Sequence, residues 1–225
     1  MGQQAEIVSA PDAGRSVRGG HLTDYAYQRL RDDIITVRLA PGDPLDEKTL
    51  SAKLDVGLSP VRNALKRLTL ERLAVIFPRR GTFVAEINIS DERWLTEIRM
   101  ELEGLAAALA AERATDTEHE TLRALSSRLD DASDVSLDYI SVDAEIHRAI
   151  YAAARNPYLE TALEQYANLA LRIWHYALTR ARSRRPESCD QSAVVQAISD
   201  NNPEAARKAA EDHLRGFSQA VRAML

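Results

Sequence analysis

Basic side chains suited to binding nucleic acid gather between residues 58 and 85. This stretch holds six Lys or Arg residues against a single acidic one, Glu71. The planar guanidinium of arginine can donate two parallel hydrogen bonds to a guanine edge or to a phosphate. The stretch therefore favours contact with a polyanion, the alternative being a solvated surface without a partner. Its basic residues are Arg62, Lys66, Arg67, Arg72, Arg79 and Arg80.

Three short helices are expected to position the first of these arginines. Apolar residues at helical spacing over 22–35 predict a first helix, which ends before the turn sequence Ala-Pro-Gly-Asp-Pro. Asp46 is the expected N-cap of a second helix. Ser59 and Pro60 predict the start of a third helix, with Ser59 as its N-cap and Pro60 as its first residue.

A hairpin with a basic tip is expected to follow the third helix. Two short runs of strand-forming residues, 74–77 and 82–85, are joined by the sequence Pro-Arg-Arg-Gly. Three helices followed by a hairpin, within some 65 residues, match the plan of a winged helix-turn-helix.

In that motif the second helix of the pair lies in the major groove of DNA and presents its first residues to the base edges. Arg62 is then the best candidate for a contact with guanine or phosphate, and Ser59 for a contact with phosphate. We expect double-stranded DNA as the partner, although a winged helix that binds protein is the alternative. Further contacts with the DNA backbone or minor groove are expected from Lys48, Arg79, Arg80 and Gly81.

These sequence pieces resemble the DNA-binding domain of GntR-family transcriptional regulators, from Tyr25 to Phe83. The resemblance implies regulation of transcription through an operator sequence. One position departs from the family pattern, because Leu58 stands where the family places Arg or another polar residue. The matching pieces are LAPGDPL at 39–45, LSAKL at 50–54, SPVRNALKRL at 59–68 and RGTFV at 80–84.

The rest of the chain reads as helical throughout. The first of these helices is expected to turn a stripe containing Leu95, Ile98, Leu102, Leu105, Ala106 and Leu109 toward a core. A polar break is expected at 131–134 and a basic loop at 183–186. The sequence therefore predicts a mainly α protein, with an all-α bundle of about six helices after the winged helix. The predicted helices are 90–113, 116–129, 137–154, 158–182, 187–200 and 203–223.

The net charge of the chain changes sign near residue 90, where the winged helix ends and the helical bundle is expected to begin. The net charge is −5 overall, but residues 1–90 carry +2 and residues 91–225 carry −7. We expect a flexible tail over 1–20, rich in Gly, Ser and Gln. A DNA-binding domain over 21–88 and a helical effector-binding and dimerisation domain over 89–225 are expected to follow.

The helical part resembles one branch of the same family, the FadR type, whose C-terminal ligand-binding domain is called FCD. The residues 95–103 resemble its opening helix, Asp143 to His147 resemble its usual Asp-x-x-Phe-His, and an Asn-Pro pair follows at 156–157. That branch binds a divalent metal through one Asp and three His. Asp143 and His147 lie four residues apart and so share one helix face. His213 matches the last ligand of the family.

The fourth expected ligand falls on Gln191 instead of a histidine. An amide oxygen is a weaker ligand than imidazole for transition metals, so both a metal of the Zn, Ni or Mn class and a metal-free site stay open. The branch senses small organic acids. The resemblance implies Arg99 as the first candidate to clamp a carboxylate, with Arg172 as the second or else a surface residue. For His21, His119 and His175 we expect ordinary structural roles.

Composition excludes several other classes of protein. With 45% apolar and 28% charged residues, the chain is expected to fold and not to be disordered. No apolar run is long enough to span a membrane, and the first 20 residues lack the apolar core of a secretory signal. A single cysteine, Cys189, cannot form an internal disulfide, so a cytoplasmic location is expected.

The function that these observations predict is a ligand-responsive transcriptional regulator. It is expected to bind a near-palindromic operator as a homodimer, in the manner of a repressor, and to respond to a small carboxylate effector. Two alternatives are a metal-assisted hydrolase carrying an accessory DNA-binding module and a constitutive DNA-binding architectural protein. No hydrolase motif is found in the sequence, and we expect no enzymatic activity.

Overall fold

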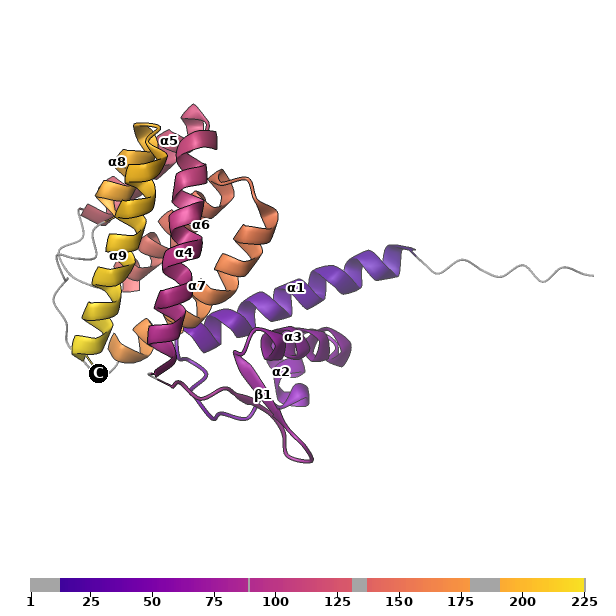
Figure 1. The fold of residues 1–225 in the computed structure, drawn as a ribbon. Helices are drawn as coiled ribbons and strands as arrows, with labels where there is room; N and C mark the ends of the chain where they lie inside the picture. Colours follow the sequence, from indigo (N-terminus) through magenta and orange to yellow (C-terminus); the bar gives the residue numbers. More distant parts are fainter. Residues whose placement is uncertain (1–12, 89, 131–136, 179–190, 225) are drawn as a thin grey trace, which may run out of the picture. The chain divides into compact units, whose positions relative to one another are not determined.

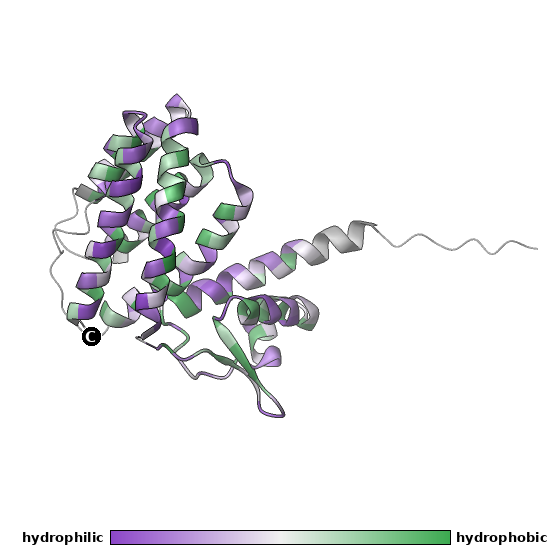
Figure 2. Ribbon diagram, in the orientation of Figure 1, coloured by the Kyte–Doolittle hydropathy of each residue, from purple (hydrophilic) through white to green (hydrophobic). Residues whose placement is uncertain are grey.

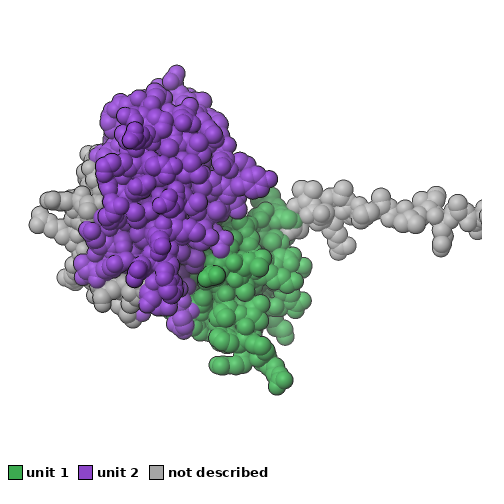
Figure 3. All heavy atoms as spheres, in the orientation of Figure 1, with its two compact units in different colours: residues 1–34, 39–85 green, residues 35–38, 86–225 purple. Residues whose placement is uncertain are grey.

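The chain forms two compact units, seen here in a computed structural model (Figures 1 and 3). The structure describes residues 13–88, 90–130, 137–178 and 191–224. Unit 1 contains the residues up to Ile34 together with Leu39–Ala85. Unit 2 contains Ile35–Arg38 together with the residues from Glu86 onward. The predicted break at 131–134 and the predicted loop at 183–186 lie outside the described residues.

Unit 1 is a winged helix. Helices α1 (Ala13–Ile35), α2 (Glu47–Leu54) and α3 (Leu58–Leu70) precede strands β1 (Ala74–Phe77) and β2 (Gly81–Val84). The strands pair antiparallel, with Ala74 opposite Val84 and Phe77 opposite Gly81. The segment after α1 joins this sheet, since the Leu45 amide donates to the Thr82 carbonyl at 2.8 Å. The predicted winged helix-turn-helix is thus confirmed.

Two details of unit 1 differ from the prediction. Helix α1 begins at Ala13 and so includes residues 13–20 of the predicted flexible tail, whose residues 1–12 lie outside the described part of the chain. The glycines of that stretch obscured the helix-forming Ala and Arg residues among them. Helix α3 begins at Leu58, with Gly57 as its N-cap and no side-chain cap. Ser59 therefore lies in the first turn and does not cap the helix.

Other local predictions in unit 1 are confirmed. The Asp46 side chain caps α2 by accepting a hydrogen bond from the Thr49 amide at 2.8 Å. The wing turn needs left-handed backbone at two residues, Arg79 (φ 64°) and Gly81 (φ 101°). Glycine takes this conformation without strain, which explains its place at the start of β2.

Unit 2 consists of six helices in the described residues, in agreement with the predicted bundle. Buried side chains from these helices form one apolar core, with Trp174 and Tyr151 among the largest. Green apolar and purple polar segments alternate along the helices of unit 2 in Figure 2. None of the described helices is long and apolar enough to cross a membrane. The helices are α4 (Ser90–Arg113), α5 (Asp116–Asp130), α6 (Leu137–Ala153), α7 (Pro157–Leu178), α8 (Ser192–Ser199) and α9 (Pro203–Met224).

Helix α4 buries the predicted stripe only in part: Leu95, Leu102 and Leu109 pack against the core, and Ala106 is fully buried. Ile98 and Leu105 are exposed, whereas Arg99 and Glu103 are buried with a run of alanines. The physical reason is the close approach of α9: a Cβ on Gly104 would lie 3.1 Å from Glu211 Oε1. Small residues permit this approach, so Ala107, Ala110 and Ala111 are buried beside Ala106. The three leucines of the stripe lie at the edge of the same core.

Candidate functional site

The outer face of α3 carries the predicted DNA contacts. Val61, Leu65 and Leu68 are buried against unit 1, and this leaves Ser59 and Arg62 exposed on the opposite side. The Arg62 Nε atom donates to Glu47 Oε2 on α2 at 2.6 Å. The pair is exposed, so water screens it and a phosphate or base can compete for the guanidinium. Lys48, on α2, is exposed as well.

The wing tip presents the second set of predicted contacts. Arg79, Arg80 and Gly81 are exposed at the turn, where the Arg80 amide donates to the Phe77 carbonyl at 3.1 Å. Phe77 and Phe83 pack edge to face with ring centroids 5.6 Å apart. The Arg80 guanidinium lies 5.7 Å from the Phe77 ring, so the two aromatic rings support a cation at the tip.

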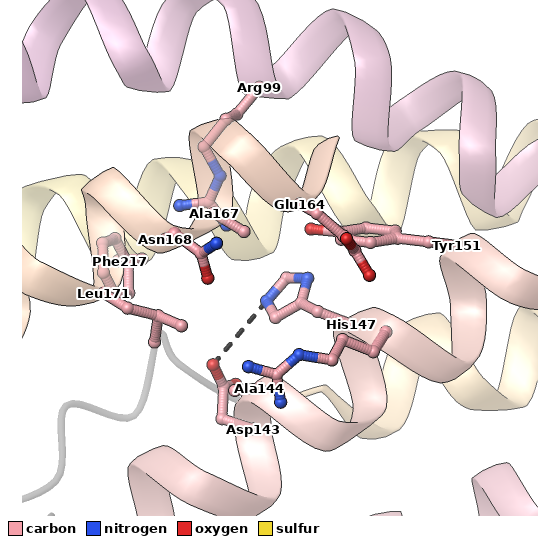
Figure 4. Close-up of a pocket in the computed structure, with 11 residues that line it drawn as sticks. Arg99, Asp143, Ala144, His147, Tyr151, Glu164, Ala167, Asn168, Leu171 and Phe217 are labelled. Carbon is pink, nitrogen blue, oxygen red and sulfur yellow. Dashed lines mark ion pairs between the residues drawn. The ribbon is translucent and has the colours of Figure 1, made fainter. Parts of the chain in front are cut away.

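A second candidate site is a polar cluster inside unit 2. Asp143 and His147 lie on α6 and His213 on α9, and one ligand atom from each lies within 4.8 Å of the others. His147 Nε2 is 3.6 Å from Asp143 Oδ2 (Figure 4), and His213 Nε2 is 3.8 Å from Asp143 Oδ1. All three side chains are buried. The structure therefore brings together three of the four residues predicted as metal ligands.

The fourth residue, Gln191, reaches the same cluster in an unexpected role. It is fully buried just before α8, and its Nε2 atom donates to Asp143 Oδ1 at 2.7 Å. Its Oε1 atom has no hydrogen-bond partner among the described residues, and neither ring nitrogen of His213 has one. Buried polar atoms are rarely left unpaired, so these three atoms suggest room for a missing group. The carboxylate, the two imidazoles and the amide oxygen fit a divalent metal ion.

Glu103 is the residue of this cluster that the sequence reading missed. Its Oε2 atom is 2.6 Å from His147 Nδ1, and its Oε1 atom accepts from Arg99 Nε at 2.6 Å. The signal available was the Arg–Glu spacing of four residues on one helix face. Such pairs are usually solvated, and nothing local showed that this one is buried.

Glu103 also sets the protonation of its neighbours. Burial would raise the pKa of its carboxyl, but Arg99 and His147 outweigh that effect and lower it. Burial would lower the pKa of His147, and the Glu103 and Asp143 carboxylates raise it instead. Burial lowers the pKa of His213. Because Nδ1 of His147 faces Glu103, its Nε2 is the nitrogen directed to Asp143, as in metal sites where a carboxylate orients the histidine ligand.

Three small cavities surround the cluster, each lined by two of its three members. The first is also lined by Arg99, Asn168 and Tyr151 (Figure 4). Arg99, predicted to clamp a carboxylate, therefore borders a cavity, although its Nε is already bonded to Glu103. A ligand carboxylate would have to use its remaining guanidinium nitrogens.

Arg172 is buried on α7 but does not line these cavities. Burial lowers the pKa of its guanidinium to about 10, against the opposing effect of Glu86. Its neighbour along the helix, Leu171, lines two of the cavities instead. The other histidines lie outside the cluster, with His119 and His175 buried and His21 exposed.

Comparison with known proteins gives matches over both units. The family model described as "Bacterial regulatory proteins, gntR family" matches residues 22–84, and the FCD domain model matches residues 94–216. The HTH-type transcriptional repressor RspR of Escherichia coli K12 is 25% identical over 209 residues, covering 89% of each chain. The repressor GlaR of the same strain is 30% identical over 157 residues, 66% of this chain and 71% of GlaR.

Solved structures show the same fold. E. coli McbR/YncC superposes with a TM-score of 0.76 at 24% identity, over 90% of this chain and 96% of that one. A putative GntR regulator from Rhodococcus sp. RHA1 superposes with a TM-score of 0.68 at 22% identity, over 89% of this chain and 97% of that one. A winged helix followed by this helical domain defines a class of DNA-binding transcriptional regulator. The chain belongs to the GntR family of bacterial regulatory proteins and carries an FCD domain.

Proposed function

We propose that this regulator is a cytoplasmic repressor which binds a palindromic operator as a homodimer and responds to a small carboxylate bound in unit 2. One observation carries the proposal: the same chain holds an exposed basic surface on α3 and the wing and a buried metal-ligand cluster bordered by cavities. The repressor names of RspR and GlaR support the direction of regulation.

An exposed apolar stripe on α4 supports the homodimer. Trp94 is 62% exposed, and Ile98 and Leu105 follow at positions that share one helix face. Exposed aromatic and aliphatic side chains in one stripe are costly to leave in water. A second copy of the chain would cover the stripe through the same residues, and the resulting twofold symmetry would match the two halves of a palindrome.

Within unit 2, we propose that Asp143, His147 and His213 hold a divalent metal of the Zn, Ni or Mn class. When bound, the cation would supply a positive centre to which a carboxylate oxygen can bind. The histidines must be neutral to act as ligands, so acid would weaken metal binding. The Gln191 amide keeps Asp143 oriented and offers at most a weak fourth ligand.

The buried charges explain why a carboxylate would need that cation. The raised pKa of His147 favours its protonated form, so Arg99 and His147 contribute one positive charge each and Glu103 and Asp143 one negative charge each. The metal-free cluster then has no net positive charge to attract an organic acid. A divalent ion held by neutral histidines gives the cluster a net positive charge. Metal and effector are therefore expected to bind cooperatively, since each raises the affinity for the other.

The test measures metal and effector binding on the full chain purified without metal-affinity resin or chelator. We expect close to one bound ion per subunit by elemental analysis, and His213→Ala to lose it. Gln191→His should bind Zn²⁺ at least about tenfold more tightly in a chelator competition, because imidazole replaces the amide. Ser192→Ala, one residue along, is the control and should leave Zn²⁺ affinity unchanged.

The second arm titrates a panel of carboxylates (pyruvate, malate, citrate and gluconate) while DNA binding is followed. We expect one of them to change operator affinity by about 5- to 150-fold, and only in the metal-loaded protein. Equal metal content in the wild type and His213→Ala would overturn the metal site. Operator affinity unchanged by every acid would favour the constitutive architectural protein instead.

A further inference from the structure

Leu58 is an apolar side chain placed where the rest of the proposed DNA surface is polar. It is the first residue of α3 and is 37% exposed, and its chain neighbours Gly57 and Ser59 are exposed as well. The core of unit 1 is completed by other residues of the same helix, Val61, Ala64, Leu65 and Leu68. Leu58 is therefore covered only in part by the fold, and the rest of its side chain is presented to solvent on this surface.

The position of Leu58 relative to Arg62 gives it access to the same ligand. The two residues are four apart and so lie one turn from each other on α3. Arg62 extends into solvent beside Glu47, with 57% of its side chain exposed. In a helix-turn-helix, the first turn of the second helix is the part that meets the base edges. A ligand that contacts Arg62 in the groove would therefore also meet Leu58.

The chemistry of a leucine side chain restricts what it can recognise there. It neither donates nor accepts hydrogen bonds, and covering a polar base edge with it would leave that edge unpaired at a cost. Only one apolar group is displayed in the major groove of DNA, the C5-methyl of thymine. We infer that Leu58 reads a thymine methyl group in each half of the operator, next to the contact that Arg62 makes.

This inference rests on the proposed operator binding and makes Leu58 a determinant of sequence preference. Burying one methyl against an aliphatic side chain corresponds to about threefold to fivefold in affinity. Such a preference would separate the operators of this chain from those of relatives with arginine at the position, because arginine selects guanine.

The experiment first selects sequences from a random duplex pool with the full-length wild-type protein. In the selected duplex, each dT is then replaced in turn by deoxyuridine, which lacks only the methyl group. We expect one dT in each half-site at which the replacement weakens wild-type binding about threefold to fivefold. Leu58→Ala should bind both duplexes equally, and Leu58→Arg should select guanine at that base pair.

Leu70→Ala is the matched control, because Leu70 is the last residue of the same helix and is 82% exposed. It lies about 18 Å along the helix axis from Leu58, and its deoxyuridine response should equal that of the wild type. Circular dichroism and binding to unselected DNA show that each variant is folded.

Two outcomes overturn the inference: a wild-type protein insensitive to every deoxyuridine replacement, or a Leu58→Ala variant with the wild-type response. Failure of the wild type to enrich any sequence would instead overturn the operator binding on which the inference rests.

Discussion

The two units each hold an Arg–Glu ion pair with the same short distance, and the pairs differ in burial. Arg62 Nε and Glu47 Oε2 are 2.6 Å apart in unit 1, with the arginine side chain 57% exposed. Arg99 Nε and Glu103 Oε1 are also 2.6 Å apart in unit 2, with the arginine side chain 6% exposed. Distance alone would rank the two pairs as equal.

Burial separates what the two pairs can do. The exposed pair contributes little to stability, and its guanidinium can leave Glu47 for DNA at small cost. The buried pair cannot lose one partner without leaving a charge uncompensated in the interior. Arg62 of unit 1 thus stays available for a partner. Arg99 of unit 2 instead holds Glu103 in position, and the other oxygen of Glu103 contacts His147.

The largest expected effect comes from breaking the buried pair. Glu103→Ala should lower the free energy of unfolding of unit 2 by about 3–5 kcal/mol, because Arg99 and His147 both lose their carboxylate. Denaturant unfolding followed by circular dichroism measures it. Glu101→Ala, exposed on the same helix, is the control and should change stability by less than about 0.5 kcal/mol. Equal losses in the two variants would contradict the comparison.

Breaking the exposed pair should affect binding and spare the fold. Arg62→Ala is expected to weaken binding to the selected duplex by about 1–3 kcal/mol per half-site, and to leave thermal unfolding nearly unchanged. Fluorescence anisotropy measures the binding. Arg128→Ala is a matched control, since Arg128 in unit 2 has the same side-chain exposure and also pairs with a glutamate, Glu145. If both variants bind DNA like the wild type, the placement of α3 in the groove is wrong.

A partly buried hydrogen bond in unit 1, between Tyr27 and Glu71, should give the smallest effect when it is removed. The Tyr27 hydroxyl donates to Glu71 Oε2 at 2.6 Å, and burial together with Glu71 raises the pKa of this tyrosine to about 12. The neutral form is favoured by folding, so its contribution is complete below pH 10 and is lost as the pH rises through 12.

Tyr27→Phe should therefore lower the free energy of unfolding by about 1 kcal/mol at pH 8. Between pH 10 and 12 its free energy of unfolding should fall less steeply with pH than that of the wild type. Tyr25→Phe, exposed two residues earlier, is the control. Parallel pH profiles for the wild type and Tyr27→Phe would exclude Tyr27 as the source of the alkaline loss.

The sequence predicted unit 1 closely because its signals are local. The Asp46 cap, the turn before it and the hairpin strands each depend on a few neighbouring residues, and all are found in the structure. The starts of α1 and α3 were the exceptions. Helix α1 begins at Ala13, inside the predicted tail. Serine before proline is a strong cap signal, but the chain enters α3 at Leu58.

Unit 2 was predicted less fully because its site depends on contacts distant in sequence. Helical spacing joined Asp143 to His147, but His213 is 70 positions away and was reached only through family resemblance. The inner face of α4 was predicted only in part, since Leu95, Leu102 and Leu109 pack against the core but Ile98 and Leu105 are exposed, and a buried Arg–Glu pair lies on this helix. Nor could the sequence show that the Gln191 amide donates to Asp143, because that depends on where α8 begins.

The four residues Ile35–Arg38 belong by their contacts to unit 2, although residues of unit 1 precede and follow them. The chain therefore passes between the units three times, not once. We expect an exchange of the DNA-binding domain of this chain through a single junction near Glu86 to remove these four residues from the helical domain. A chimera with a foreign DNA-binding domain would have to retain Ile35–Arg38 of its own helical domain, or supply a substitute that fits it.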